Sequence, residues 1–133
     1  MYRRSVYQLG DDYPHEGFVQ RALESHFERL GFQVRYGSDL DFVCVHPVTH
    51  EQWWIEAKGQ TSQVGLDFRT GLGQLVQKMT DEKNNYGLAI PAIQEFVHQC
   101  EKVDPWVRKQ LNLHWLVVSE DASVRVIAPD DSL

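Results

Sequence analysis

The sequence predicts an α/β fold in which a mixed central sheet is flanked by helices. Two observations lead to this prediction: apolar residues recur at helical spacing in three stretches, and short runs of β-branched and aromatic residues alternate with them. The expected order is helix, three strands, helix, strand, helix, strand, which favours layers packed around a sheet. A chain of 133 residues has the usual size of one domain. We therefore expect a single domain over residues 1–133, with its core at about residues 15–118.

The first helix is expected over residues 15–30, where apolar side chains recur at helical spacing and Gly31 follows as a C-cap. Aromatic and β-branched residues then predict three strands, at residues 32–36, 40–46 and 52–57. The turn at residues 47–50 would join the second and third strands, so an antiparallel meander is expected.

The second half of the chain continues this alternation. Residues 60–67 are polar and contain a glycine, so we expect a loop there before a helix over residues 68–79. Residues 93–111 are expected to form one helix, or two that are broken near Pro105. The remaining strands are expected at residues 86–90, 114–118 and, at the edge of the sheet, 123–127.

Composition excludes several classes of protein. No apolar run approaches the roughly 18 residues of a membrane helix, and a charged, turn-rich stretch stands where a signal peptide would be apolar. Cys44 and Cys100 lack a Cys-x-x-Cys partner, and we expect both to be buried thiols. The net charge of −6 argues against coating nucleic acid by bulk electrostatics. We expect a soluble, cytoplasmic protein without a membrane segment.

One group of charged residues is a candidate active site. Because side chains alternate along a strand, Glu56 and Lys58 should project on one face while Trp53 and Ile55 project on the other. Antiparallel pairing through the preceding turn could bring Asp41 beside Glu56. Two carboxylates and an ammonium group would then converge at one edge of the sheet.

This grouping suits the hydrolysis of a phosphodiester. Carboxylate oxygens are the ligands that Mg²⁺ or Mn²⁺ prefers, so Asp41 and Glu56 would be the metal ligands. Lys58 would either orient and help deprotonate the attacking water or offset charge that develops in the transition state. The histidines lack a paired ligand spacing, so no zinc site is expected, and we expect no organic cofactor.

Asp41, fourteen intervening residues and then Glu56-Ala57-Lys58 on the next strand resemble the signature of the PD-(D/E)xK nuclease superfamily. The resemblance covers about residues 15–118. It implies a restriction-endonuclease-like three-layer core, DNA as the substrate, Asp41 and Glu56 as metal ligands, and Lys58 as the catalytic lysine. Leu40 stands where the family often has proline, and Asp39 remains the alternative to Asp41.

The resemblance extends to two helices. Many members place a further acid on the first helix, and Glu16 or Glu24 is the candidate here, with Glu16 preferred because it is nearest the helix start. Gly73-Gln74-Leu75 is similar to the glutamine motif of RecB-like nucleases, which implies that Gln74 supports the site. Lys78 stands where a tyrosine is common in that branch.

Three hypotheses for function follow. The first is a metal-dependent endonuclease or exonuclease acting on DNA, with Asp41, Glu56, Lys58, Gln74 and Glu16 in its site. The second is a nuclease-fold binding or scaffold subunit of a DNA-processing or defence complex. The third is an unrelated α/β protein that matches the motif by accident. A homodimer or a partner protein is left open.

Overall fold

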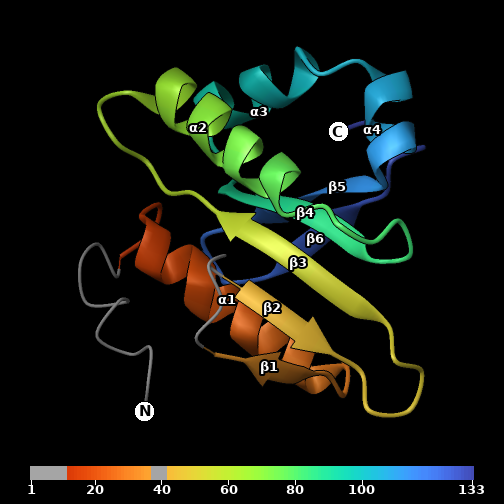
Figure 1. The fold of residues 1–133 in the computed structure, drawn as a ribbon. Helices are drawn as coiled ribbons and strands as arrows, with labels where there is room; N and C mark the ends of the chain where they lie inside the picture. Colours follow the sequence, from red (N-terminus) through yellow and green to blue (C-terminus); the bar gives the residue numbers. More distant parts are fainter. Residues whose placement is uncertain (1–11, 37–41) are drawn as a thin grey trace.

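Residues 12–36 and 42–133 are described by a computed structural model, in which six strands form one sheet with helices on both faces (Figure 1). The elements are α1 (Glu16–Arg29), β1 (Gln33–Arg35), β2 (Phe42–Val45), β3 (Gln52–Ala57), α2 (Val64–Gln77), β4 (Asn85–Pro91), α3 (Gln94–Glu101), α4 (Pro105–Leu111), β5 (Leu113–Val118) and β6 (Val124–Ile127). The predicted class, a mixed sheet in a three-layer α/β arrangement, is confirmed.

The strands lie side by side in the order of the sequence. β1, β2 and β3 form the predicted antiparallel meander, β3, β4 and β5 are parallel, and β6 returns antiparallel at the edge. The two parallel connections run through α2 and through α3 and α4, which cover one face of the sheet, while α1 covers the other (Figure 1). Right-handed crossovers that progress in one direction place their helices on a common face, which accounts for this layering.

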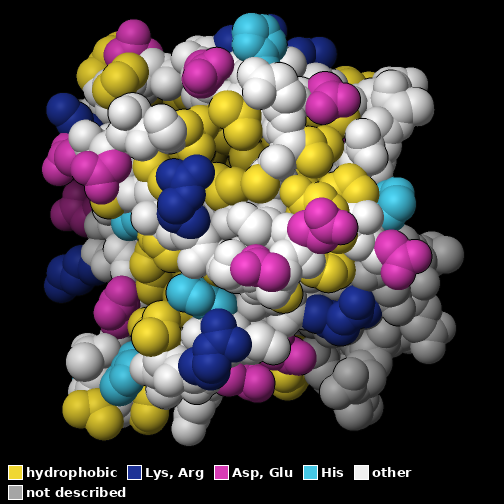
Figure 2. All heavy atoms as spheres, turned by 180° about the vertical axis from the view of Figure 1, so that it is seen from behind, with side chains coloured by type: hydrophobic (Ala, Val, Ile, Leu, Met, Phe, Trp, Pro, Cys, Tyr) yellow, Lys and Arg dark blue, Asp and Glu magenta, His cyan; other side chains and the backbone are white. Residues whose placement is uncertain are grey.

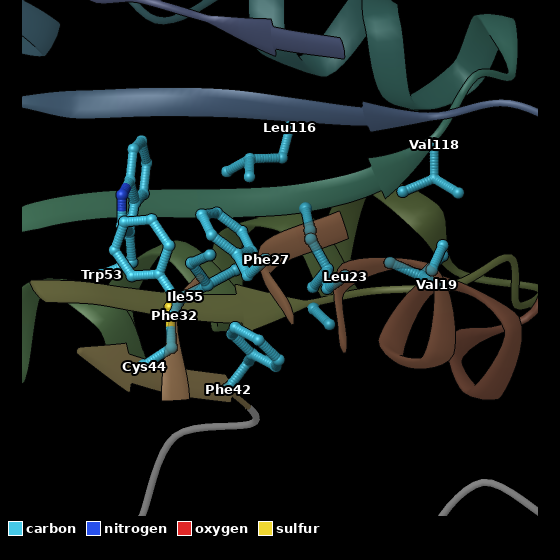
Figure 3. Packing of buried hydrophobic residues seen from close by; sticks show 13 residues of the cluster. Val19, Leu23, Phe27, Phe32, Phe42, Cys44, Trp53, Ile55, Leu116 and Val118 are labelled. Carbon is cyan, nitrogen blue, oxygen red and sulfur yellow. The ribbon is translucent and has the colours of Figure 1, made fainter. Parts of the chain in front are cut away.

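The layer between α1 and the sheet is built around aromatic side chains. Phe27 is 1% exposed, and its ring centroid lies 5.6 Å from that of Phe42 and 5.3 Å from that of Trp53. Figure 3 shows these rings between α1 and the strands, next to Ile55 and Leu116. The apolar stripe that predicts the first helix is therefore the face that this helix buries against the sheet.

The opposite layer packs α2 and α3 on the other face of the same strands. Its buried core contains Val43, Phe68, Leu75, Leu88, Phe96 and Trp115. Trp54 packs against this second core, whereas Trp53, Ile55 and Ala57 belong to the core under α1. The alternation expected along β3 is confirmed, and the face that carries Trp54 is covered by α2.

One helix prediction needs correction, and the structure decides between two alternatives for another. The helix expected from residue 68 begins at Val64, inside the expected loop, and its first turn is formed by residues 64–67. The Asp67 carboxylate accepts a hydrogen bond from the Thr61 hydroxyl, which itself accepts one from the Gln63 N–H. The stretch 93–111 forms two helices broken before Pro105, which is one of the two predicted alternatives, since Asp104 caps α4 and Pro105 occupies its first turn.

No helix within residues 12–36 and 42–133 combines the length and apolar character needed to cross a membrane.

Candidate active site

Glu56 and Lys58 lie together at the carboxyl end of β3. Lys58 Nζ is 3.6 Å from Glu56 Oε2, and the side chains of the two residues are 17% and 8% exposed, respectively. The Lys58 N–H donates to the carbonyl of Ala89, so the backbone remains tied to β4 just beyond the end of β3. The predicted placement of Glu56 and Lys58 side by side is therefore observed, in a position that is largely screened from solvent.

Helix α2 covers this pair, and Gly71 is the residue of closest approach. A Cβ atom at Gly71 would lie 2.6 Å from Cε and 3.3 Å from Cγ of Lys58, and 3.4 Å from Cγ of Glu56. Ordinary carbon–carbon contacts are about 3.5–4.0 Å, so a larger residue could not fit without moving the lysine. The aliphatic stem of Lys58 therefore runs directly beneath the backbone of α2.

The start of α1 adjoins the same end of β3. A Cβ atom at Gly59 would lie 2.0 Å from the backbone nitrogen of Glu16, so the two backbones touch and only glycine fits there. The Gln60 N–H donates to the Pro14 carbonyl at 2.8 Å, which fastens the residues after β3 to those before α1. The structure thus brings Glu16 next to the strand that carries Glu56 and Lys58.

The two acids predicted on α1 have different surroundings. Glu16 Oε2 lies 3.5 Å from Nε2 of Gln20, one turn along the helix. Glu24 Oε2 accepts a hydrogen bond from the Tyr36 hydroxyl at 3.0 Å, at the end of the first strand. Glu16 is therefore the acid whose backbone adjoins β3, and Glu24 is engaged with the residue that follows β1.

Gln74 and the second acid-x-lysine sequence lie outside this close contact. Gln74 is exposed on α2, three residues beyond Gly71. Asp81 and Lys83 are exposed in the connection between α2 and β4, where the Asp81 carboxylate accepts from the Lys83 N–H. Asp81-Glu82-Lys83 is thus a turn, as its polar setting in the sequence indicates.

Asp41 and its alternative Asp39 lie outside the described residues. The register of β2 and β3 is described from Phe42 opposite Ile55 onward. Phe42 directly follows Asp41 in the sequence, and Ile55 directly precedes Glu56. Within the described part of the chain, no cluster of three or more His, Cys, Asp or Glu side chains could hold a metal ion. The prediction of two converging carboxylates therefore remains a prediction.

Burial shifts the pKa values of a histidine on β5 and of two cysteines, one on β2 and one on α3. Burial lowers the pKa of His114, whose ring centroid is 4.6 Å from that of Trp53. Nδ1 of His114 lies 3.1 Å from the carbonyls of Tyr86 and Asn112. Burial also raises the pKa of the Cys44 and Cys100 thiols to about 12, in keeping with the expectation that both are buried. These groups support the fold.

Two residues of the site were not among the sequence predictions. Gly71 has no side chain to signal its role, and in the sequence it only weakens the prediction of a helix. Gln20 lies between Glu16 and Glu24 on one helical face, and polar residues on such a face are usually exposed. The sequence therefore gives no sign that the Gln20 side chain is only 2% exposed. Close backbone approach and burial are properties of the packed structure.

The fold has a counterpart among solved structures. No protein-family model matches this sequence, and no curated protein is similar to it in sequence. The chain is similar in structure to the crystal structure of an XisH family protein from Nostoc punctiforme PCC 73102, with a TM-score of 0.57. The two chains are 16% identical, and the match covers 80% of this chain and 95% of the other. At this identity the likeness shows a shared fold.

Proposed function

We propose that this chain is a divalent-metal-dependent nuclease that hydrolyses phosphodiester bonds in DNA. The observation that carries the proposal is the pairing of a buried carboxylate, Glu56, with Lys58 at the end of a strand. Withdrawing two charges from water is costly, so a carboxylate and an ammonium group held together at a strand end are a candidate functional site. The sequence signature formed with Asp41 supports the same function.

The residues present fit Mg²⁺ or Mn²⁺. Mg²⁺ is commonly held by one or two carboxylates, with water and substrate phosphate completing its coordination. Glu56 supplies one such carboxylate, and Asp41 is proposed to supply the second. When bound, the cation would polarise the phosphoryl group and lower the pKa of a bound water.

Lys58 would act on the nucleophile or on the developing charge. Its ammonium nitrogen lies 3.6 Å from Glu56 Oε2, and the Lys58 side chain is the less buried of the two. From there it can orient a water by hydrogen bonding, or offset negative charge on the phosphoryl oxygens. The layer formed by α2 over the lysine stem limits the positions that the ammonium group can reach, which favours one orientation.

A second candidate function is supported by the charge of the molecule. The net charge is −6, and the face in Figure 2 shows Lys and Arg side chains dispersed among acidic ones, without one basic patch. Proteins that bind DNA by themselves usually present a basic face. A subunit that keeps this fold and acts within a DNA-processing complex would not need such a face.

The proposal is tested by incubating the purified chain with linear, circular, single-stranded and branched DNA in Mg²⁺ or Mn²⁺, with and without EDTA. Glu56→Gln, Lys58→Met and Asp41→Asn are assayed beside the wild type, and Asp39→Asn decides between the two candidate acids. Lys83→Met is the matched control, because Lys83 belongs to the exposed acid-x-lysine copy.

We expect cleavage that EDTA and each of the three site substitutions abolish, while Lys83→Met remains active. Loss of about 100-fold or more in rate is the expected scale for removing a group that stabilises the transition state. Cleavage that persists in Lys58→Met would contradict the assigned site. No cleavage of any substrate by the wild type would favour the scaffold function.

A further inference from the structure

Gln20 carries a buried polar atom without a partner. Its side chain is on α1 and 2% exposed, and its Oε1 atom has no hydrogen-bond partner among residues 12–36 and 42–133. The amide nitrogen of the same group lies 3.5 Å from Glu16 Oε2. A buried amide oxygen without a partner is unfavourable for folding, and an apolar residue of similar size would avoid this cost. We therefore expect a bound molecule to donate a hydrogen bond to Gln20 Oε1.

The position of Gln20 relates it to the proposed active site. Its amide reaches Glu16, and the backbone of Glu16 touches Gly59, the residue after Lys58. Figure 1 shows the start of α1 next to the end of β3. Gln20 Oε1 therefore belongs to a side-chain amide that already contacts Glu16, the acid next to the carboxyl end of β3.

Gln20 differs from Arg108, whose buried side chain has a structural role. Arg108 is also buried and also has an unpartnered atom, Nε. Its terminal nitrogens, however, donate to the carbonyls of Ile127, Ala128 and Asp131, and its guanidinium lies 5.0 Å from the ring centroid of Trp115. Arg108 thus has an evident role in holding the C-terminal segment, whereas within the described residues the Gln20 amide makes one long polar contact, to Glu16.

We propose that Glu16 and Gln20 form an outer-shell site for the hydrated divalent cation, in which Gln20 Oε1 accepts a hydrogen bond from a cation-bound water. Mg²⁺ sheds its water reluctantly, so its waters need acceptors in the surrounding protein. Glu16 contributes a charged acceptor and Gln20 a neutral one. This inference rests on the proposed function, and it assigns Gln20 as a positioning residue rather than a catalytic one.

The test compares cation affinity with stability in the full-length chain. Calorimetric titration with Mg²⁺ and with Mn²⁺ is performed on the wild type, Gln20→Met and Glu16→Gln, and thermal unfolding is measured without added cation. Gln52→Met is the matched control: it makes the same chemical change at the other end of β3, where the Gln52 oxygen is already bonded to Trp54 Nε1. Gln20→Glu is a second variant that keeps an acceptor oxygen.

We expect Gln20→Met to unfold at a higher temperature than the wild type and to bind Mg²⁺ about 10- to 100-fold more weakly, the usual range for outer-shell changes. Glu16→Gln should also weaken binding, Gln20→Glu should retain it, and Gln52→Met should lower the unfolding temperature with unchanged affinity. Wild-type affinity in Gln20→Met would overturn the inference while leaving the proposed nuclease intact. A wild type that binds neither cation would overturn both, and one that binds but cleaves no DNA would contradict the proposed function alone.

Discussion

Replacing Gly71 by alanine would displace the Lys58 side chain, because Gly71 lies on α2 directly over the aliphatic part of this lysine. The added Cβ would lie 2.6 Å from Lys58 Cε and 3.4 Å from Glu56 Cγ. Because ordinary carbon–carbon contacts are about 3.5–4.0 Å, the lysine stem has to retreat by about 1 Å. The stem is flexible, so the chain should still fold, with the ammonium group displaced from its place beside Glu56.

The effects on stability and on activity can be separated in magnitude. Alanine in place of a glycine inside a helix stabilises by roughly 0.5–1 kcal/mol. Forcing the lysine off its preferred rotamer costs about 0.5–1.5 kcal/mol, so the unfolding free energy should stay within about 1 kcal/mol of the wild type. A misplacement of about 1 Å can cost on the order of 100-fold in rate, so activity should fall far more than stability.

Gly73→Ala is the matched control on the same helix. Apart from the backbone of its own helix and its chain neighbours, a Cβ atom at Gly73 would have no atom of the described residues within 4 Å. It should therefore gain the full roughly 0.5–1 kcal/mol and cleave DNA at the wild-type rate. Urea unfolding and single-turnover cleavage are measured for both variants. Wild-type cleavage by Gly71→Ala would contradict the proposal that α2 sets the position of Lys58.

Three further predictions concern the framework. Phe27→Ala should lower the unfolding free energy by about 3–5 kcal/mol, measured by urea unfolding, because the ring is 1% exposed and its loss leaves a cavity; a loss below about 1 kcal/mol would contradict this packing. Cys44 and Cys100 should resist a thiol reagent in the native protein and react on unfolding, since burial raises the pKa of each thiol to about 12; rapid reaction of either without unfolding would be inconsistent with the structure. Burial holds the pKa of His114 below its ordinary 6.5, so below that pH the unfolded chain binds more protons and the unfolding free energy should fall as the pH drops. Urea unfolding at about pH 7.5 and about pH 5.5 should show a smaller difference for His114→Gln than for the wild type, and equal differences would exclude this assignment.

The fold was predictable from the sequence wherever local pattern and packing agree. The stretch 52–57 alternates large apolar residues with polar ones, and β3 occupies the same residues because each face of the strand meets a different core. The start of α2 was not predictable in this way. Its first turn contains Gly65, a poor helix former, and the contact between Thr61 and Asp67 that holds this turn exists only in the folded chain.

Some residues of the candidate site could be predicted from the sequence and others could not. Glu56 and Lys58 could be placed together because alternation along one strand is a local rule. Gly71 and Gln20 could not be assigned, since their roles depend on how α2 and α1 approach the end of β3 from opposite layers. A glycine that makes room and a buried amide with an unpaired oxygen become visible only when distances and burial are known.

The central claim is that Glu56 and Lys58 form the active site of a metal-dependent nuclease. The most direct test is the rate of DNA cleavage in Mg²⁺ by the wild type and by Lys58→Met at equal concentration, with EDTA as the control. We expect cleavage by the wild type that EDTA stops, and a loss of about 100-fold or more in Lys58→Met. Equal cleavage by both proteins would contradict it.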